Sequence, residues 1–202
     1  MVDHHNRAVR PEHTTPTTRP PLTAFVLAGG RGSRMGGRDK GLLEFQGRPL
    51  IHHVLDALMP QVDGLIINAN RHLEDYATFG HPVLADTRPG RFGPLAGFIT
   101  AMELSPTRHF VIVPCDGPFL PPDLVDGLLA SAQRSAAGIA MAHDGEHAQP
   151  VYTLLHRDLL PSLERCVTAG GVKVARWLED EGATVARFPG TVFRNINTPQ
   201  DL

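Results

Sequence analysis

The chain has 202 residues, a formal net charge of −2 and a hydrophobic fraction of 42%. These values suit a single globular domain with a sizeable core. The near balance of charge excludes the strong positive field by which many proteins attract nucleic acid or an anionic membrane, and no apolar run approaches the roughly 18 residues of a membrane span.

The first segment of the chain, residues 1–21, is rich in proline, threonine and charge. Such a composition cannot bury a core, so we expect a disordered tail followed by one domain over residues 22–202. The tail has no apolar stretch typical of a signal peptide. The two cysteines, Cys115 and Cys166, lie far apart outside any CxxC pattern, which predicts no disulfide or cysteine zinc site and a reducing, cytoplasmic setting.

Short apolar runs predict strands, and apolar residues at helical spacing predict helices. In chain order, the expected strands cover 22–27, 65–70, 82–86, 110–116, 138–142, 150–155, 184–188 and 192–197. The expected helices cover 49–58, 93–104, 121–132 (with two prolines in its first turn), 159–167, 173–182 and 198–202 (with Thr198 as its cap).

Alternation of strands and helices predicts a single-domain α/β fold, with a mostly parallel open sheet and helices on both faces in a Rossmann-like arrangement. In such sheets ligands bind beyond the carboxyl ends of the strands. Polar residues and glycines follow those ends in this sequence: Gly29, Gly30, Asn68, Asp86, Asp116, Asn195 and Asn197.

The strongest local motif is LAGGRGSRMGGRDKG over residues 27–41, which follows the first strand and contains six glycines, three arginines and one lysine. Glycines let backbone N–H groups approach phosphates closely, and the basic side chains supply charged donors. The loop matches neither the Walker A pattern nor the GxGxxG fingerprint. A nucleoside triphosphate fits it, while an ordinary mobile surface loop is the alternative.

The order of several motifs is familiar. LAGGxxxRMGG-x-DKGLL, NANR, GPLAG, PCDxPFLPPDL and NINTPQDL resemble the MobA-type molybdenum cofactor guanylyltransferases of the nucleotidyltransferase superfamily, over essentially all of residues 22–202. The resemblance implies transfer of GMP from GTP to the phosphate of molybdopterin, with release of pyrophosphate and with Mg²⁺ as cofactor. It also implies transient contacts with other proteins of the cofactor pathway. A monomer is the working expectation.

The resemblance also implies roles for individual residues. Leu27, Ala28 and Gly29 would line the GTP site through their backbone, Lys40 would reach the triphosphate, and Asn68 and Asp86 would contact the nucleotide. Asp116 would hold Mg²⁺ against GTP, and Asn195 with Asn197 would lie on the pterin side. Arg34 (or Arg31) would join Lys40 in steadying the departing pyrophosphate.

Plainer readings of the same residues stay open. Asp116 could cap the following helix, Asp86 could serve only a turn, and Asn68 could be a satisfied loop amide. Cys115 is expected to be a small buried strand residue rather than a nucleophile. His143 and His147 have the spacing of a helical zinc pair, but the Asp-Gly between them favours a turn.

Two other functions remain possible from the sequence. A cytidylyl- or sugar-phosphate nucleotidyltransferase would share the glycine-rich loop. A non-catalytic GTP-binding protein that hands the cofactor to a partner would fit a chain that stops soon after NINTP. A test of nucleotide preference separates these readings.

Overall fold

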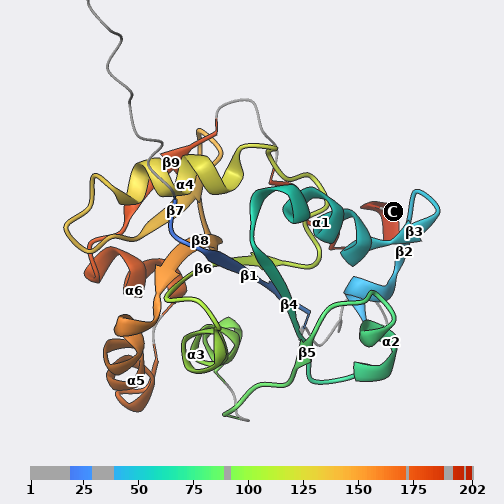
Figure 1. Cartoon of the computed structure of the whole chain (residues 1–202), viewed down its shortest axis with the longest axis horizontal. Coiled ribbons are helices and arrows are strands. Elements are labelled where there is room, and N and C mark those ends of the chain that lie inside the picture. Colours follow the sequence, from blue (N-terminus) through green and yellow to red (C-terminus); the bar gives the residue numbers. More distant parts are fainter. Residues whose placement is uncertain are drawn as a thin grey trace, which may run out of the picture.

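The computed structural model describes residues 19–28, 39–88, 92–171, 173–188, 193–197 and 199–201. The expected disordered tail therefore lies almost wholly outside the described residues, as does the glycine-rich loop from Gly29 to Arg38. Within the described ranges, the chain forms one layered α/β domain (Figure 1).

A seven-stranded sheet in the order β5-β4-β1-β6-β8-β7-β9 forms the middle layer. Strand β8 runs antiparallel to β6 and β7, and the other neighbouring pairs are parallel. This confirms the mostly parallel sheet. The strands are β1 (Leu22–Leu27), β4 (Gly64–Asn68), β5 (Val83–Leu84), β6 (His109–Pro114), β7 (Ala140–His143), β8 (Ala148–His156) and β9 (Thr184–Arg187); a separate two-stranded hairpin joins β2 (Glu44–Phe45) and β3 (Arg48–Pro49).

Helices cover both faces of the sheet, as Figure 1 shows. Helices α1 (Leu50–Leu58) and α4 (Leu124–Ala132) share one core cluster with the sheet. Helices α3 (Pro94–Leu104), α5 (Leu160–Thr168) and α6 (Val174–Asp180) share the other. The short helix α2 (Leu73–Ala77) follows β4. Because both faces are covered, β1 and β6 are nearly continuous apolar runs, as parallel strands require.

Three expected elements differ from the structure. Residues 193–197 form no strand, and their only described backbone bond to the sheet region joins Ile196 N–H to the Asp116 carbonyl. Helix α4 begins at Leu124, after the two prolines rather than around them. Proline at 122 disfavours a helical conformation at Pro121, and Asp123 has non-helical backbone angles (φ −113°, ψ 19°). The last expected helix is a single 3-10 turn, Pro199–Asp201, and its expected cap Thr198 lies outside the described residues.

The carboxyl ends of the central strands meet at one edge. Leu27, the last residue of β1, pairs with Asn68 of β4 and with Pro114 of β6, and Asn68 pairs with Leu84 of β5. Residues that follow these strands therefore emerge side by side. No helix among the described residues is long and apolar enough to cross a membrane.

Candidate active site

Three polar side chains from distant parts of the chain meet at this edge of the sheet. The ammonium group of Lys40 donates to Asp116 Oδ2 at 3.0 Å and to Asn197 Oδ1 at 2.6 Å. The side chains of Lys40 and Asp116 are only 18% and 16% exposed. Asp116 follows β6, and helix α4 has Asp123 before its first residue, so Asp116 does not cap that helix. The cluster therefore combines a cation, a carboxylate and an amide at a site that is largely shielded from solvent.

The backbone that carries Lys40 is fixed from both sides. The carboxylate of Asp39 is buried, with 6% of the residue exposed. Its Oδ1 accepts hydrogen bonds from the Gly41 N–H at 3.2 Å and from the hydroxyl of Tyr76, a fully buried residue of α2. Burial, followed by the nearby Cys115 and Asp39, raises the pKa of the Tyr76 hydroxyl far above its usual range. The hydroxyl therefore remains a donor.

Two asparagines orient Asp86 beside the end of β4. Asn68, only 3% exposed, donates from Nδ2 to Asp86 Oδ1 at 3.0 Å and to the Leu84 carbonyl at 3.1 Å. Asn70 donates to Asp86 Oδ2 at 2.7 Å, and its own Oδ1 accepts from the Asp86 N–H at 2.9 Å. The amide side chains of Asn68 and Asn70, at the end of β4, thus hold the Asp86 side chain in place. Asp86 therefore does more than form a turn.

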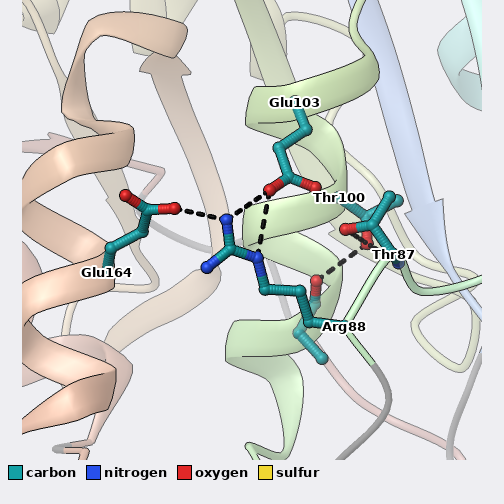
Figure 2. A network of polar contacts seen from close by, with 6 residues as sticks. Thr87, Arg88, Thr100, Glu103 and Glu164 are labelled. Atoms are coloured by element: carbon teal, nitrogen blue, oxygen red, sulfur yellow. Dashed lines mark hydrogen bonds and ion pairs between the residues drawn. The ribbon is translucent and has the colours of Figure 1, made fainter.

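The segment after Asp86 is anchored to helices α3 and α5 (Figure 2). The Thr87 N–H donates to Oγ1 of buried Thr100 at 3.0 Å. Arg88 pairs with Glu103 of α3, at 2.7 Å from Nη2 to Oε1, and with Glu164 of α5. These anchors hold the loop that leads away from Asp86 against α3 and α5.

A second buried tyrosine reaches the segment that contains Asn195. Tyr152 of β8 is fully buried, and its hydroxyl donates to Asn195 Oδ1 at 3.2 Å. Its ring contacts Phe193, with the ring centroids 4.7 Å apart. Burial, followed by the charge of Asp116, raises the pKa of this hydroxyl well above its usual range. The segment 193–197 is therefore attached through a ring contact and hydrogen bonds rather than through a strand ladder.

The structure places the other predicted residues as follows. The Leu27 carbonyl accepts from Cys115 N–H, and the Ala28 N–H donates to the Asn68 carbonyl, so these two groups are already used within the sheet. Cys115 is buried, as expected, and burial raises its thiol pKa. Gly29, Arg31 and Arg34 lie outside the described residues.

His143 ends β7, and residues 144–147 form the expected turn rather than a helix. Among the described residues, no group of three or more His, Cys, Asp or Glu side chains could hold a metal ion by itself. His143 and His147 therefore do not share the helix face that a zinc pair at this spacing would need.

Sequence reasoning missed several contributors: Asp39, Tyr76, Tyr152, Arg88 and the role of Asn70. Asp39 carried a signal, because an acidic residue within a basic, glycine-rich loop needs a partner when it is buried. The two tyrosines carried none, since nothing beside Tyr76 or Tyr152 in the sequence indicates which residue its hydroxyl contacts.

The donor chemistry suits a divalent cation shared with a phosphate ligand. A polyphosphate beside the Asp116 carboxylate would place like charges together, and a divalent cation between them removes that repulsion. Mg²⁺ typically takes one or two protein carboxylates and completes its shell with phosphate and water. Asp116, with Lys40 already on one of its oxygens, fits this arrangement.

Comparisons with known proteins bear on the family and the fold of the chain. Residues 24–185 match the family model described as a MobA-like NTP transferase domain. The chain is 43% identical over 181 residues to the molybdenum cofactor guanylyltransferase of Shewanella sediminis, covering 89% of this chain and 92% of that protein.

Solved structures share the fold at low sequence identity. Molybdopterin-guanine dinucleotide biosynthesis protein A from Archaeoglobus fulgidus superposes with a TM-score of 0.68 at 22% identity, covering 89% of this chain and 94% of that one. The inositol-1-phosphate CTP transferase from T. maritima gives 0.70 at 16% identity, covering 91% and 92%. The fold is thus shared by proteins named for different nucleotides, so fold alone does not select the base.

Proposed function

The chain belongs to the MobA-like NTP transferase family, and from this premise we propose that it transfers GMP from GTP to the phosphate of molybdopterin, releasing pyrophosphate. The observation that carries the proposal is the meeting of Lys40, Asp116 and Asn197 at the carboxyl edge of the parallel strands. The name and 43% identity of the Shewanella relative support guanine and molybdopterin as the substrate chemistry.

The proposed roles follow from charge and position. The Lys40 ammonium binds the triphosphate, and Asn68 with Asp86 faces the nucleoside from the ends of β4 and β5. The amides of Asn195 and Asn197 face the acceptor. Arg34 belongs to the loop outside the described residues, and its role beside the pyrophosphate rests on the family resemblance alone.

The reaction needs alignment and charge neutralisation more than a strong base. The attacking phosphate monoester is largely ionised at neutral pH, since its second pKa is about 6. Asp116 is the residue that would hold a divalent cation, which we propose to be Mg²⁺ and which would offset negative charge on the α-phosphate. The Lys40 ammonium group, 3.0 Å from Asp116, stabilises negative charge on the same phosphate chain.

We also propose that the protein works in a reducing, cytoplasmic setting. This proposal is supported by the two cysteines, which are both unpaired, and by the burial of Cys115 beside the site. Its product is made for use by other enzymes, so transient contacts with acceptor proteins are part of the proposal.

The test is a calorimetric titration of the whole chain with GTP, CTP and ATP, each with and without Mg²⁺, followed by an assay of GMP transfer to molybdopterin. We expect binding of GTP in preference to the other two, strengthened by Mg²⁺, and transfer that depends on both substrates. A preference for CTP would move the chain to a cytidylyl function. Binding of GTP without transfer would favour a cofactor-handling protein.

A matched pair of variants tests the site within this assay. Lys40→Ala removes the ammonium group, and loss of a charge-assisted hydrogen bond should weaken GTP binding by about 10- to 100-fold. Lys173 is the other lysine of the sequence and lies exposed before α6, so Lys173→Ala should leave GTP affinity unchanged. Equal affinities in the two variants would reject the proposed phosphate contact.

A further inference from the structure

Two buried tyrosines of the same core cluster contact the candidate site in the same way. Tyr76 and Tyr152 are the only tyrosines in the sequence, and both are fully buried. Each hydroxyl donates to a polar side chain of the site: Tyr76 to Asp39 and Tyr152 to Asn195. Neither acceptor is near its tyrosine in sequence, so the fold brings each pair together.

Each hydroxyl also lies against a glycine that directly follows a key site residue. A Cβ atom on Gly41, the residue after Lys40, would lie 2.5 Å from the Tyr76 hydroxyl oxygen. A Cβ atom on Gly117, the residue after Asp116, would lie 1.8 Å from the Tyr152 hydroxyl oxygen. Glycine at these positions therefore lets each hydroxyl reach the backbone beside the site.

The two hydroxyls fix different parts of the site. Through Asp39, Tyr76 secures the backbone on both sides of Lys40, because the same Asp39 oxygen also accepts the Gly41 N–H. Tyr152 secures Asn195 within the segment whose Ile196 N–H donates to the Asp116 carbonyl. The first contact lies on the proposed nucleotide side and the second on the proposed acceptor side.

We infer that Tyr76 and Tyr152 are positioning residues for separate substrates: Tyr76 sets the affinity for the nucleotide through Asp39 and Lys40, and Tyr152 sets the affinity for the acceptor through Asn195. This inference rests on the proposed function. Each hydroxyl would then affect the affinity for one substrate only. A hydrogen bond that merely stabilises the fold would not produce this selectivity.

The experiment measures both substrates in Tyr76→Phe and Tyr152→Phe, each of which removes a single oxygen atom. In Tyr76→Phe, the Kd for GTP should rise by about tenfold, the effect of one lost buried hydrogen bond, while the KM for molybdopterin stays unchanged. In Tyr152→Phe, the KM for molybdopterin should rise by a similar factor of about ten, while the Kd for GTP stays unchanged.

Thr153→Val is the matched control. Thr153 is the neighbour of Tyr152 on β8, is fully buried, and donates its hydroxyl to the Ala140 carbonyl at 2.7 Å, away from the site. This variant also loses one buried hydroxyl hydrogen bond, so it should lower the melting temperature without changing either substrate constant. It separates a positioning effect from a general loss of stability.

The outcomes distinguish the inference from the proposed function. A wild-type chain that neither binds GTP nor transfers GMP contradicts both. An active wild-type chain whose two phenylalanine variants keep both constants, or change both constants together, contradicts the inference alone. If Tyr76→Phe does not fold, Gly41→Ala displaces the same hydroxyl from the other side, and the same selective rise in the Kd for GTP is expected.

Discussion

The contact between Gly117 and Tyr152 allows a prediction that needs no substrate. In Gly117→Ala, the new Cβ would lie 1.8 Å from the Tyr152 hydroxyl oxygen and 3.1 Å from both Tyr152 Cζ and Asn195 Oδ1. That oxygen is at the end of a stiff, fully buried ring, so the ring or the backbone must move. Overpacking of this kind costs about 1–3 kcal/mol, and we expect a loss of unfolding free energy near 2–3 kcal/mol.

Removing the oxygen should relieve much of this cost. In the double variant Gly117→Ala/Tyr152→Phe, the nearest contacts become the 3.1 Å contacts to Cζ and Asn195 Oδ1, which require only small shifts. Tyr152→Phe alone loses one hydrogen bond, worth about 1 kcal/mol. The double variant should therefore be more stable than the sum of the two single effects by about 1–2 kcal/mol.

Urea unfolding, followed by the fluorescence of the single tryptophan Trp177, measures all four proteins of this cycle. Gly64→Ala is the control, because its Cβ would meet nothing closer than Thr23 Oγ1 at 3.7 Å. Alanine there should stabilise the chain by about 0.4–1 kcal/mol through the unfolded state. If the Gly117 and Tyr152 effects add within about 0.5 kcal/mol, the contact does not exist as described.

Three other predictions follow from the site and its surroundings. Asp116→Ala should abolish GMP transfer while circular dichroism shows an intact fold, because Lys40 keeps its bond to Asn197; transfer at wild-type rate would reject the metal role. Burial raises the pKa of both tyrosine hydroxyls, so the stability they contribute is complete below the ordinary value of about 10 and is lost as the pH rises above it. Tyrosinate absorbance should then appear only together with unfolding, and its appearance near that pH in the folded chain would refute the burial argument. Arg88→Met should lower the melting temperature by no more than about 4 °C, because the Arg88 side chain is 45% exposed and water screens its ion pairs; a drop of about 8 °C or more would contradict this screening argument.

The order of strands and helices could largely be predicted from apolar periodicity. Helix α1 buries Leu50, Ile51, Val54, Leu55 and Leu58, which are the positions that indicated it. The segment 193–197 shows the limit of this reasoning. Its apolar residues Phe193 and Ile196 are both buried, but they lie three positions apart and so do not follow the period of two that a strand requires. Apolar content alone also says nothing about whether a neighbouring strand has free backbone groups to pair with.

The candidate site was predictable to the extent that it depends on strand ends. Asp116 follows the apolar strand β6, and Asn68 ends the apolar strand β4. The sheet brings both to one edge, where Lys40 is the charged partner of Asp116. Tyr76 and Tyr152 were not predictable, because their role depends on where each hydroxyl points after packing. The positions of the hydroxyl oxygens depend on long-range contacts that local sequence patterns do not encode.

The bond between Lys40 and Asn197 has a consequence for the order in which the protein matures. It joins residues 157 positions apart, whereas β1, β4 and β6 are complete by Pro114. Domains generally fold as units, so although the central strands are made early, the contacts of Lys40 with Asp116 and Asn197 are completed only when the end of this domain has been translated. A nascent chain that stops before Asn195 would therefore lack the amides that we propose to face the acceptor.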